Sequence, residues 1–316
     1  MTHKPLISVI VPAFNAELFL AETLTSVQQQ TFREFEAIVV DDGSTDRTSE
    51  IARQFVEKDA RFILLRQQKN IGESVARNAA LKQARGEWIA FLDADDVWLP
   101  GKLAAQLDLL RQEPHANLLF TNYFLWDGQN DFGRRYDDPD KFPDGDVSRR
   151  LIFFDLFGMS TVMIKREILD VAGLFDVGMS VAQDWDLWLR IAERGLCAKG
   201  VRQPMARYRV WPGSVSRNTL RMCEGNVLVL EKALARPQST SRRRAYKRSL
   251  QIARGNLNLA RVRPLIETQP RVVPVAALRA WLCCPTRLKW LLWYFATLWP
   301  NSPRAEIVYR KIRGKW

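Results

Sequence analysis

Cysteine, histidine and long apolar segments are scarce in this chain of 316 residues. The cysteines and histidines are Cys197, Cys223, Cys283, Cys284, His3 and His115. The number and spacing of the cysteines match neither a disulfide framework nor a zinc site, which favours a reducing compartment. The apolar run Trp290–Trp299 has ten residues, whereas a helix needs roughly 20 to cross a bilayer.

The N-terminus also lacks the apolar core and the small-residue cleavage site of a signal peptide. Met1 to Pro5 leads directly into a strand-like stretch, so we expect the mature chain to begin near Met1 and to stay in the cytosol. No Gly-x-Gly-x-x-Gly follows that strand, which argues against a dinucleotide-dependent dehydrogenase. A nucleotidyltransferase would need a glycine-rich phosphate loop with lysine or arginine there, and residues 12–15 (Pro-Ala-Phe-Asn) offer none.

Charge is distributed unevenly along the chain, although the net charge is +12. Residues 1–200 contain 23 basic and 31 acidic side chains, a net charge of −8, whereas residues 201–316 contain 24 basic and 4 acidic side chains, a net charge of +20. The acidic part suits a cation site, and the basic part suits an anionic surface such as phospholipid headgroups or nucleic acid. No nucleic-acid reader motif occurs, which disfavours nucleic acid as a partner.

Apolar strand patterns alternate with helical patterns in the first hundred residues. Strands are predicted at 7–11, 35–40, 61–65 and 88–92, with helices after Asn15, at 46–58 and at 73–85. Asn15 is the expected cap of the first helix, and Gly86 is the expected stop of the third. This order predicts an α/β fold with a Rossmann-like, mostly parallel sheet and helices on both faces.

Further along the chain, the pattern becomes less regular. Strands are predicted at 118–126 and 160–164, helices at 100–112 and 184–194, and a long loop at 127–146. After about residue 216 the strand signals fade and the sequence becomes helical and basic. We therefore predict an α/β domain at 1–216 and a basic helical region at 217–316.

Two carboxylates, Asp93 and Asp95, follow the predicted strand at 88–92. At a bend, such residues can converge on one cation, and Mg²⁺ or Mn²⁺ prefers oxygen ligands while keeping phosphates and waters in its other positions. The pair could hold a metal that bridges a donor diphosphate and stabilises the departing nucleoside diphosphate. A polar strand end with an aspartate cap would explain the same residues without chemistry.

Other polar residues lie where a ligand of an α/β sheet binds, beyond the carboxyl ends of the strands. Asp42 could accept a hydrogen bond from the imide N–H of a base, or it could form an Asp-Gly turn. Phe14 could stack on a base beside Pro12 and Asn15, or this segment could be a turn with a buried Phe. Arg77 could reach a phosphate or a base edge, or it could lie on a helix surface.

Asp184 is the candidate general base, in the tryptophan-rich stretch Gln183-Asp184-Trp185-Asp186-Leu187-Trp188. An aromatic wall would raise the pKa of this carboxyl by desolvation, which suits a base. An N-cap role would explain Asp184 without chemistry. Asp186 is the competing candidate.

The order and spacing of these motifs resemble family 2 of the inverting nucleotide-sugar glycosyltransferases, which have the GT-A fold. The motifs are Ser8–Asn15, Gln30–Phe32, Val39–Asp46, Gly72 with Ala76–Asn78, Gly86 with Phe91–Asp96, Asp184–Trp188, and more weakly Tyr208-Arg209 with Pro212–Ser214. The resemblance covers about two-thirds of the chain.

The resemblance implies a role for each site residue. Pro12, Phe14 and Asp42 contact the base, with Arg77 nearby. Asp93 contacts the ribose or the metal shell, and Asp95 coordinates Mn²⁺ or Mg²⁺ on the donor diphosphate. Asp184 deprotonates an acceptor hydroxyl. The acceptor oxygen then displaces the nucleoside diphosphate, with inversion at the anomeric carbon.

Two positions depart from the family pattern. Gln183 stands where the family usually has Glu before the catalytic Asp, so the base has a neutral neighbour. Trp211 occupies the place of a histidine that often lies near the metal, so coordination rests on Asp95, the diphosphate and water. The Gln-x-x-Arg-Trp motif of processive members is absent, which favours transfer of a single sugar.

These features predict transfer from a UDP-sugar to a hydroxyl of a cell-surface glycan or a lipid-linked acceptor. Residues 271–316 combine tryptophans with arginines and lysines, so they either dock on an anionic membrane, peripherally on its inner face, or form a packed helical element. The alternative function is an inactive glycosyltransferase-like domain that binds a membrane or nucleic acid.

Overall fold

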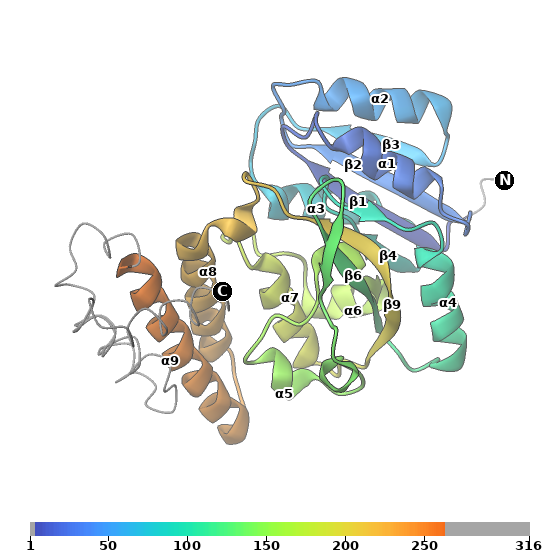
Figure 1. Cartoon of the computed structure of the whole chain (residues 1–316). Coiled ribbons are helices and arrows are strands. Elements are labelled where there is room, and N and C mark those ends of the chain that lie inside the picture. Colours follow the sequence, from blue (N-terminus) through green and yellow to red (C-terminus); the bar gives the residue numbers. More distant parts are fainter. Residues whose placement is uncertain (1–3, 263–316) are drawn as a thin grey trace. The chain divides into compact units, whose positions relative to one another are not determined.

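The computed structural model describes residues 4–262 (Figure 1), and the chain divides into two compact units between Gly213 and Ser214. The first unit contains the strands β1 (Ile7–Ala13), β2 (Phe35–Asp41), β3 (Phe62–Arg66), β4 (Trp88–Phe91), β5 (Val97–Trp98), β6 (Leu118–Trp126), β7 (Asp131–Arg134), β8 (Met163–Lys165) and β9 (Ala198–Arg209). Its α-helices are α1 (Leu20–Gln28), α2 (Thr48–Lys58), α3 (Glu73–Gln83), α4 (Lys102–Gln112), α5 (Ser148–Leu151), α6 (Arg166–Ala172) and α7 (Gln183–Ala192).

These strands form one sheet in the order β3-β2-β1-β4-β8-β6-β9-β5, with β7 paired to β6. The first four strands in that order run parallel, as the alternating strand–helix pattern predicts. Strand β8 then runs antiparallel to both β4 and β6, and β9 runs parallel to β6. The α/β prediction is confirmed, and antiparallel strands extend the parallel half of the sheet.

The sheet is covered on both faces by helices. The predicted apolar stripe Leu20, Leu24 and Val27 of α1 is fully buried in the same core cluster as Val9 and Val11 of β1. Helix α3 instead packs on β1 and β2 from the opposite face, because the right-handed crossover from β3 to β4 runs in the reverse direction along the sheet. Burial on both faces explains why β1 and β2 are apolar nearly throughout.

Two local predictions are wrong. Asn15 does not cap a helix, because α1 begins at Leu20; Asn15 has a φ of +47° and its side-chain oxygen accepts a hydrogen bond from Thr45 N over 3.0 Å. Gly86 does not stop α3, which already ends at Gln83. Gly86 is instead required by close packing on β1, since a Cβ there would lie 2.5 Å from Ser8 N.

The second half of the sheet also differs in detail from the sequence prediction. The strand predicted at 118–126 is confirmed as β6, whereas the strand predicted at 160–164 is β8 at Met163–Lys165, after a 3₁₀ turn at Met159–Thr161. The predicted loop at 127–146 contains β7. Strand β9 was not predicted.

In the described part of the second unit, the α-helices α8 (Thr219–Ala235) and α9 (Thr240–Val262) pack against each other. Asn218 caps α8 by accepting a hydrogen bond from Arg221 N over 3.1 Å. Helix α9 carries seven Arg or Lys residues and no Asp or Glu. Within residues 4–262, no helix combines the length and apolarity needed to cross a membrane. The predicted membrane segment at 271–316 lies outside the described residues.

Candidate active site

The ends of β1 and β2 carry the residues predicted to bind a base. Asp42 follows β2, and its N–H donates to Ala13 O over 2.8 Å. Its buried carboxylate accepts hydrogen bonds from Ile71 N (3.1 Å) and Gly72 N (2.9 Å), so the loop before α3 holds it in place. These two backbone donors, one for each oxygen, leave further lone pairs for an imide N–H.

The residues of the Pro12–Asn15 segment differ in their exposure. Pro12 is buried within β1, opposite Val40 of β2, so its side chain is packed in the sheet. Phe14 is 44% exposed, in contrast to the buried Phe of the alternative explanation, and its ring is available for stacking. Asn15 joins this segment to the loop after β2, since its N–H also donates to Ser44 Oγ over 3.0 Å.

Three carboxylates lie together at the end of β4. Asp96 is buried and accepts hydrogen bonds from Arg209 N (2.8 Å) and from Ser160 Oγ. The same Ser160 hydroxyl accepts from Asp93 N over 3.0 Å, which fixes the bend that follows the strand. The side chain of Asp95 accepts from Trp211 Nε1 over 2.9 Å.

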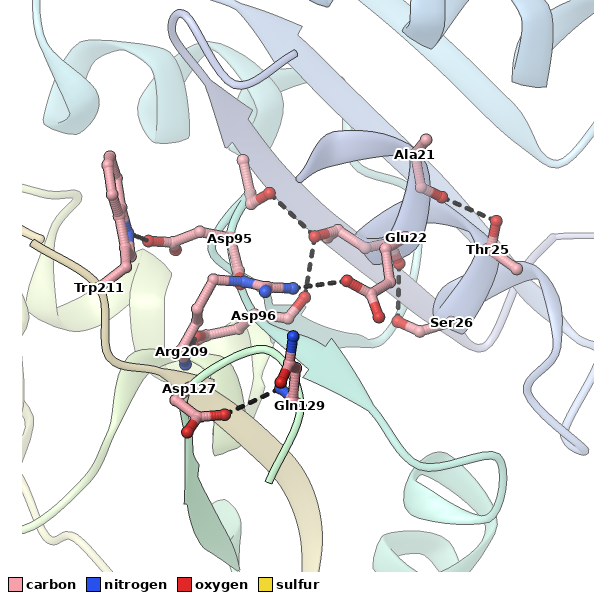
Figure 2. Close-up of polar contacts among 12 residues, drawn as sticks. Ala21, Glu22, Thr25, Ser26, Asp95, Asp96, Asp127, Gln129, Arg209 and Trp211 are labelled. Atoms are coloured by element: carbon pink, nitrogen blue, oxygen red, sulfur yellow. Dashed lines mark hydrogen bonds and ion pairs between the residues drawn. The ribbon is translucent and has the colours of Figure 1, made fainter. Parts of the chain in front are cut away.

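Arg209 holds this bend from the other side. Figure 2 shows its guanidinium between Glu22 and the main chain of Asp95, to which it donates over 2.5 Å and 2.8 Å respectively. The guanidinium also lies 4.1 Å from the ring centroid of Trp126 and 4.5 Å from that of Phe19. This arginine therefore orients the carboxylate cluster without binding any of its carboxylate oxygens through its own side chain.

Burial raises the pKa of each carboxylate in the cluster. The pKa of Asp93 rises to about 7, because burial and repulsion by Glu73 and Asp95 outweigh the attraction of Arg77. Burial likewise raises the pKa of Asp95, against the hydrogen bond from Trp211, and burial with repulsion by Asp95 and Asp93 raises that of Asp96 well above its usual range. Burial disfavours the ionised form of each carboxylate, and a bound cation would stabilise that form.

The donor set fits a hard cation that takes most of its ligands from elsewhere. Asp93 and Asp95 supply carboxylate oxygens, the ligands that Mg²⁺ and Mn²⁺ prefer. Within the described part of the chain, no three His, Cys, Asp or Glu residues form a group that would hold a metal. One or two carboxylates with phosphate oxygens and water are a common ligand set for Mg²⁺, so a diphosphate would complete the site.

Arg77 connects this cluster to α3. It is 1% exposed, so the alternative of a surface arginine is wrong. Its Nη2 donates to Glu73 Oε1 and to Asp93 Oδ1, each over 2.6 Å. Its Nε and Nη1 are buried and have no hydrogen-bond partner in the structure. Buried guanidinium nitrogens without partners are costly, so they indicate an acceptor that a ligand would supply.

Asp184 lies near Arg77 at the start of α7. Its Oδ1 accepts a hydrogen bond from Trp185 N over 2.8 Å. Burial raises its pKa, in the direction expected of a base; Trp185 N and Arg77 oppose this shift, and Glu73 adds to it. Asp186 is the weaker candidate, because it is buried and paired with Arg190 Nε over 2.9 Å.

Sequence reasoning missed three residues around the predicted base. Glu73 joins Arg77 to Gln183, whose Nε2 donates to Glu73 Oε2 over 2.6 Å. Asp155 has a pKa raised well above its usual range by burial and by the charge of Asp184. Arg135 lowers the pKa of Asp155 and donates to its carbonyl oxygen over 3.0 Å. None of these residues belongs to a motif, so no signal in the sequence identifies them.

The model of the family described as "Glycosyl transferase family 2" matches residues 8–170. The chain belongs to this family. It is 36% identical over 217 residues to the putative teichuronic acid biosynthesis glycosyltransferase TuaG of Bacillus subtilis, covering 68% of this chain and 83% of TuaG. It is 32% identical over 229 residues to WfaP of Escherichia coli, named a UDP-Glc:alpha-D-GlcNAc-diphosphoundecaprenol beta-1,3-glucosyltransferase, covering 71% of this chain and 85% of WfaP.

Solved structures share the fold at lower identity. Residues 1–349 of S. aureus TarS, in complex with UDP-GlcNAc, match 98% of this chain and 91% of that chain at 20% identity, with a TM-score of 0.63. The mannosyltransferase PcManGT from Pyrobaculum calidifontis, in complex with GDP-Man and Mn²⁺, covers 98% of this chain and 84% of its own at 23% identity, with a TM-score of 0.64. The fold is GT-A, and the protein is a family 2 glycosyltransferase.

Proposed function

We propose that this glycosyltransferase transfers a single sugar from a nucleotide diphosphate, a UDP-sugar being favoured, to an acceptor hydroxyl, with inversion. The observation that carries the proposal is the buried Arg77, which binds Asp93 of the carboxylate cluster and lies near Asp184. One guanidinium thus links the proposed diphosphate side of the site to the proposed base, and two of its nitrogens still need acceptors.

Asp184 acts as the general base in this proposal. Its raised pKa makes the ionised carboxylate a better proton acceptor, which suits removal of a proton from an acceptor hydroxyl. The resulting oxygen attacks the anomeric carbon as the bond to the diphosphate breaks, and a single displacement inverts the configuration. Arg77 stabilises the negative charge that develops on the phosphates.

Asp95 and Asp93 would hold Mg²⁺ or Mn²⁺ on the diphosphate. The ion would act as a Lewis acid for the departing nucleoside diphosphate. Trp211 supports Asp95 through its indole N–H, where the family often has a histidine. Asp96, Ser160 and Arg209 keep the bend rigid, so the two proposed ligands are held in place before the donor binds.

Asp42 and Phe14 would bind the base. The exposed Phe14 ring offers a stacking surface, and the Asp42 carboxylate would accept the imide N–H of uracil. Asn15 and Pro12 shape the same strand end. A UDP donor is supported further by WfaP, whose name gives UDP-Glc, and by TarS, which was solved with UDP-GlcNAc.

The proposed acceptor is a glycan or a lipid-linked sugar, in cell-surface polysaccharide biosynthesis. TuaG is named for teichuronic acid biosynthesis and WfaP for a diphosphoundecaprenol acceptor. Such an acceptor places the enzyme at the cytoplasmic side of a membrane, as a peripheral protein. Helix α9 supports this location, since Arg243, Arg244, Lys247 and Arg248 are exposed on it and its first turn has no acidic residue.

A thermal-shift panel tests the donor site. Wild type and Asp95→Ala are heated with UDP, dTDP, GDP or ADP, with and without Mn²⁺ or Mg²⁺. We expect UDP to stabilise wild type only with metal, and Asp95→Ala to lose that shift. Stabilisation by none of the nucleotides would favour the alternative, an inactive glycosyltransferase-like domain that binds an anionic membrane through its basic region.

A further inference from the structure

Glu73, the first residue of α3, joins two parts of the site through its two carboxylate oxygens. Oε1 accepts from Arg77 Nη2 and Oε2 accepts from Gln183 Nε2, both over 2.6 Å. Gln183 is the first residue of α7 and directly precedes Asp184. The two helix starts are 110 positions apart in the sequence and are connected here by one carboxylate.

The chemistry of Glu73 determines which side chain can occupy position 183. An ionised carboxylate only accepts hydrogen bonds, so its partner must donate, and the amide of Gln183 does so. A second carboxylate at 183 would place two negative charges at hydrogen-bond distance. Gln183 is only 6% exposed and the Glu73 side chain is 45% exposed, so water would screen that repulsion only from the Glu73 side. Gln183, the neutral residue that departs from the family pattern, is therefore the hydrogen-bond donor that the Glu73 carboxylate of α3 needs.

The backbone before α7 explains why this contact affects Asp184. Ala182 has a φ of +54°, a left-handed conformation that a non-glycine residue keeps only when its surroundings enforce it. No side chain caps the helix start by accepting a hydrogen bond. Ser74 and Asn78 of α3 bind the preceding segment at Met179 and Phe175. Glu73 extends this attachment into α7 itself.

We propose that Glu73 and Gln183 are a matched pair that positions Asp184, so that a carboxylate at 73 requires an amide at 183. The pair acts through Asp184 and rests on the proposed role of that residue as the base. The inference also predicts that the two side chains can be exchanged. In Glu73→Gln/Gln183→Glu, the amide at 73 would still accept from Arg77 through its oxygen and would donate to the carboxylate at 183 through its nitrogen.

The test is a double-mutant cycle on the full-length chain. Gln183→Glu, Glu73→Gln and the exchanged double variant are compared with wild type. The readouts are the thermal midpoint of the free protein and the kcat and KM for hydrolysis of UDP-glucose to UDP and glucose, with water as the acceptor, or of whichever UDP-sugar stabilises wild type. Gln183→Leu removes the hydrogen bond without adding charge. Glu50→Gln on α2, which removes a carboxylate paired with Arg47, is the matched control.

We expect Gln183→Glu to lower the thermal midpoint and to reduce kcat by roughly tenfold or more, with a smaller change in KM. The exchanged variant should recover both the thermal midpoint and kcat. Adding Glu73→Gln to Gln183→Leu should restore neither quantity. Because Glu73 and Asp155 both face Asp184, along with Arg77, Glu73→Gln alone should also move the acidic limb of the kcat profile to lower pH.

The inference is overturned if the exchanged variant is no better than Gln183→Glu in midpoint and kcat, or if Gln183→Glu resembles wild type in both. Asp184→Asn, assayed in parallel, separates this result from a failure of the proposed function. Full turnover by Asp184→Asn would refute the assignment of the base, and the thermal midpoints would still measure the coupling between positions 73 and 183.

Discussion

The indole N–H of Trp211 donates a hydrogen bond to Asp95 Oδ2 over 2.9 Å, while its ring packs edge-on against Phe19 at 5.0 Å. An indole can orient a carboxylate, but it offers no lone pair to a metal. The proposed cation therefore has oxygen ligands only, from the protein, the diphosphate and water. Such a set suits Mg²⁺ as well as Mn²⁺, whereas an added imidazole would favour the transition metal.

Trp211→His is expected to tighten Mn²⁺ binding in the presence of UDP, with a smaller gain for Mg²⁺. The reason is the nitrogen ligand that the imidazole adds beside Asp95. Titration of free Mn²⁺ by electron paramagnetic resonance measures this directly. Trp211→Phe is the control, because it keeps an aromatic ring and supplies neither a donor nor a ligand. Equal affinities for Trp211→His and Trp211→Phe would show that position 211 does not face the metal.

Asp184→Asn is expected to lower kcat by about 10²- to 10⁴-fold, the usual contribution of a general base. The amide keeps the shape of the side chain but cannot take a proton. UDP with metal should still raise the thermal midpoint of the variant, because the proposed donor contacts lie at Asp42 and Asp95. Asp186→Asn serves as the comparison, since its carboxylate is engaged with Arg190. A larger loss of kcat in Asp186→Asn would reverse the assignment.

The pH dependence of kcat follows from the raised pKa of Asp184. A base must be ionised to act, so the rate rises with pH through this pKa, and the acidic limb should lie above the usual aspartate value of about 3.9. Repulsion by Glu73 contributes to this raised pKa of Asp184, so Glu73→Gln should move the limb to lower pH. A profile of kcat against pH for both proteins measures the shift. A limb that stays in place, or moves upward, would contradict this coupling.

The sequence predicts the parallel half of the sheet and the strand ends that carry the site. Strands β1, β2 and β4 are apolar because both of their faces are buried, and their polar ends meet at one edge because they run parallel. The resemblance to the family motif further identifies Asp184 as the predicted base. These features are local in sequence, or they follow from the order of the strands.

The remaining features depend on contacts between distant segments. The sequence of β9 is a weak strand signal, because it contains Lys, Arg, Gln and Pro. Its extended structure depends on pairing with β6 and β5. The burial of Arg77 depends on Asp93 and Glu73, and the hydrogen bond of Gln183 depends on Glu73. Asn15 resembles a helix cap in sequence, but its side-chain oxygen accepts a hydrogen bond from Thr45 N in the loop after β2 instead. The hydrophobic periodicity of a sequence does not predict such contacts between distant residues.

Arg77 should be essential both for stability and for donor binding. Arg77→Met would leave the Asp93 carboxyl without its guanidinium, and at a pH well above 7, where that carboxyl is ionised, breaking a buried ion pair in this way costs up to about 3–5 kcal/mol. The thermal midpoint should therefore fall, and the shift produced by UDP with metal should disappear. Asp93→Asn added to Arg77→Met removes the unpaired charge, so the midpoint should recover while the UDP shift stays absent. Asp93→Asn alone is the control, because Asp93 is itself a proposed metal ligand. If UDP still stabilised the double variant, the unpartnered nitrogens of Arg77 would have no role in binding the donor.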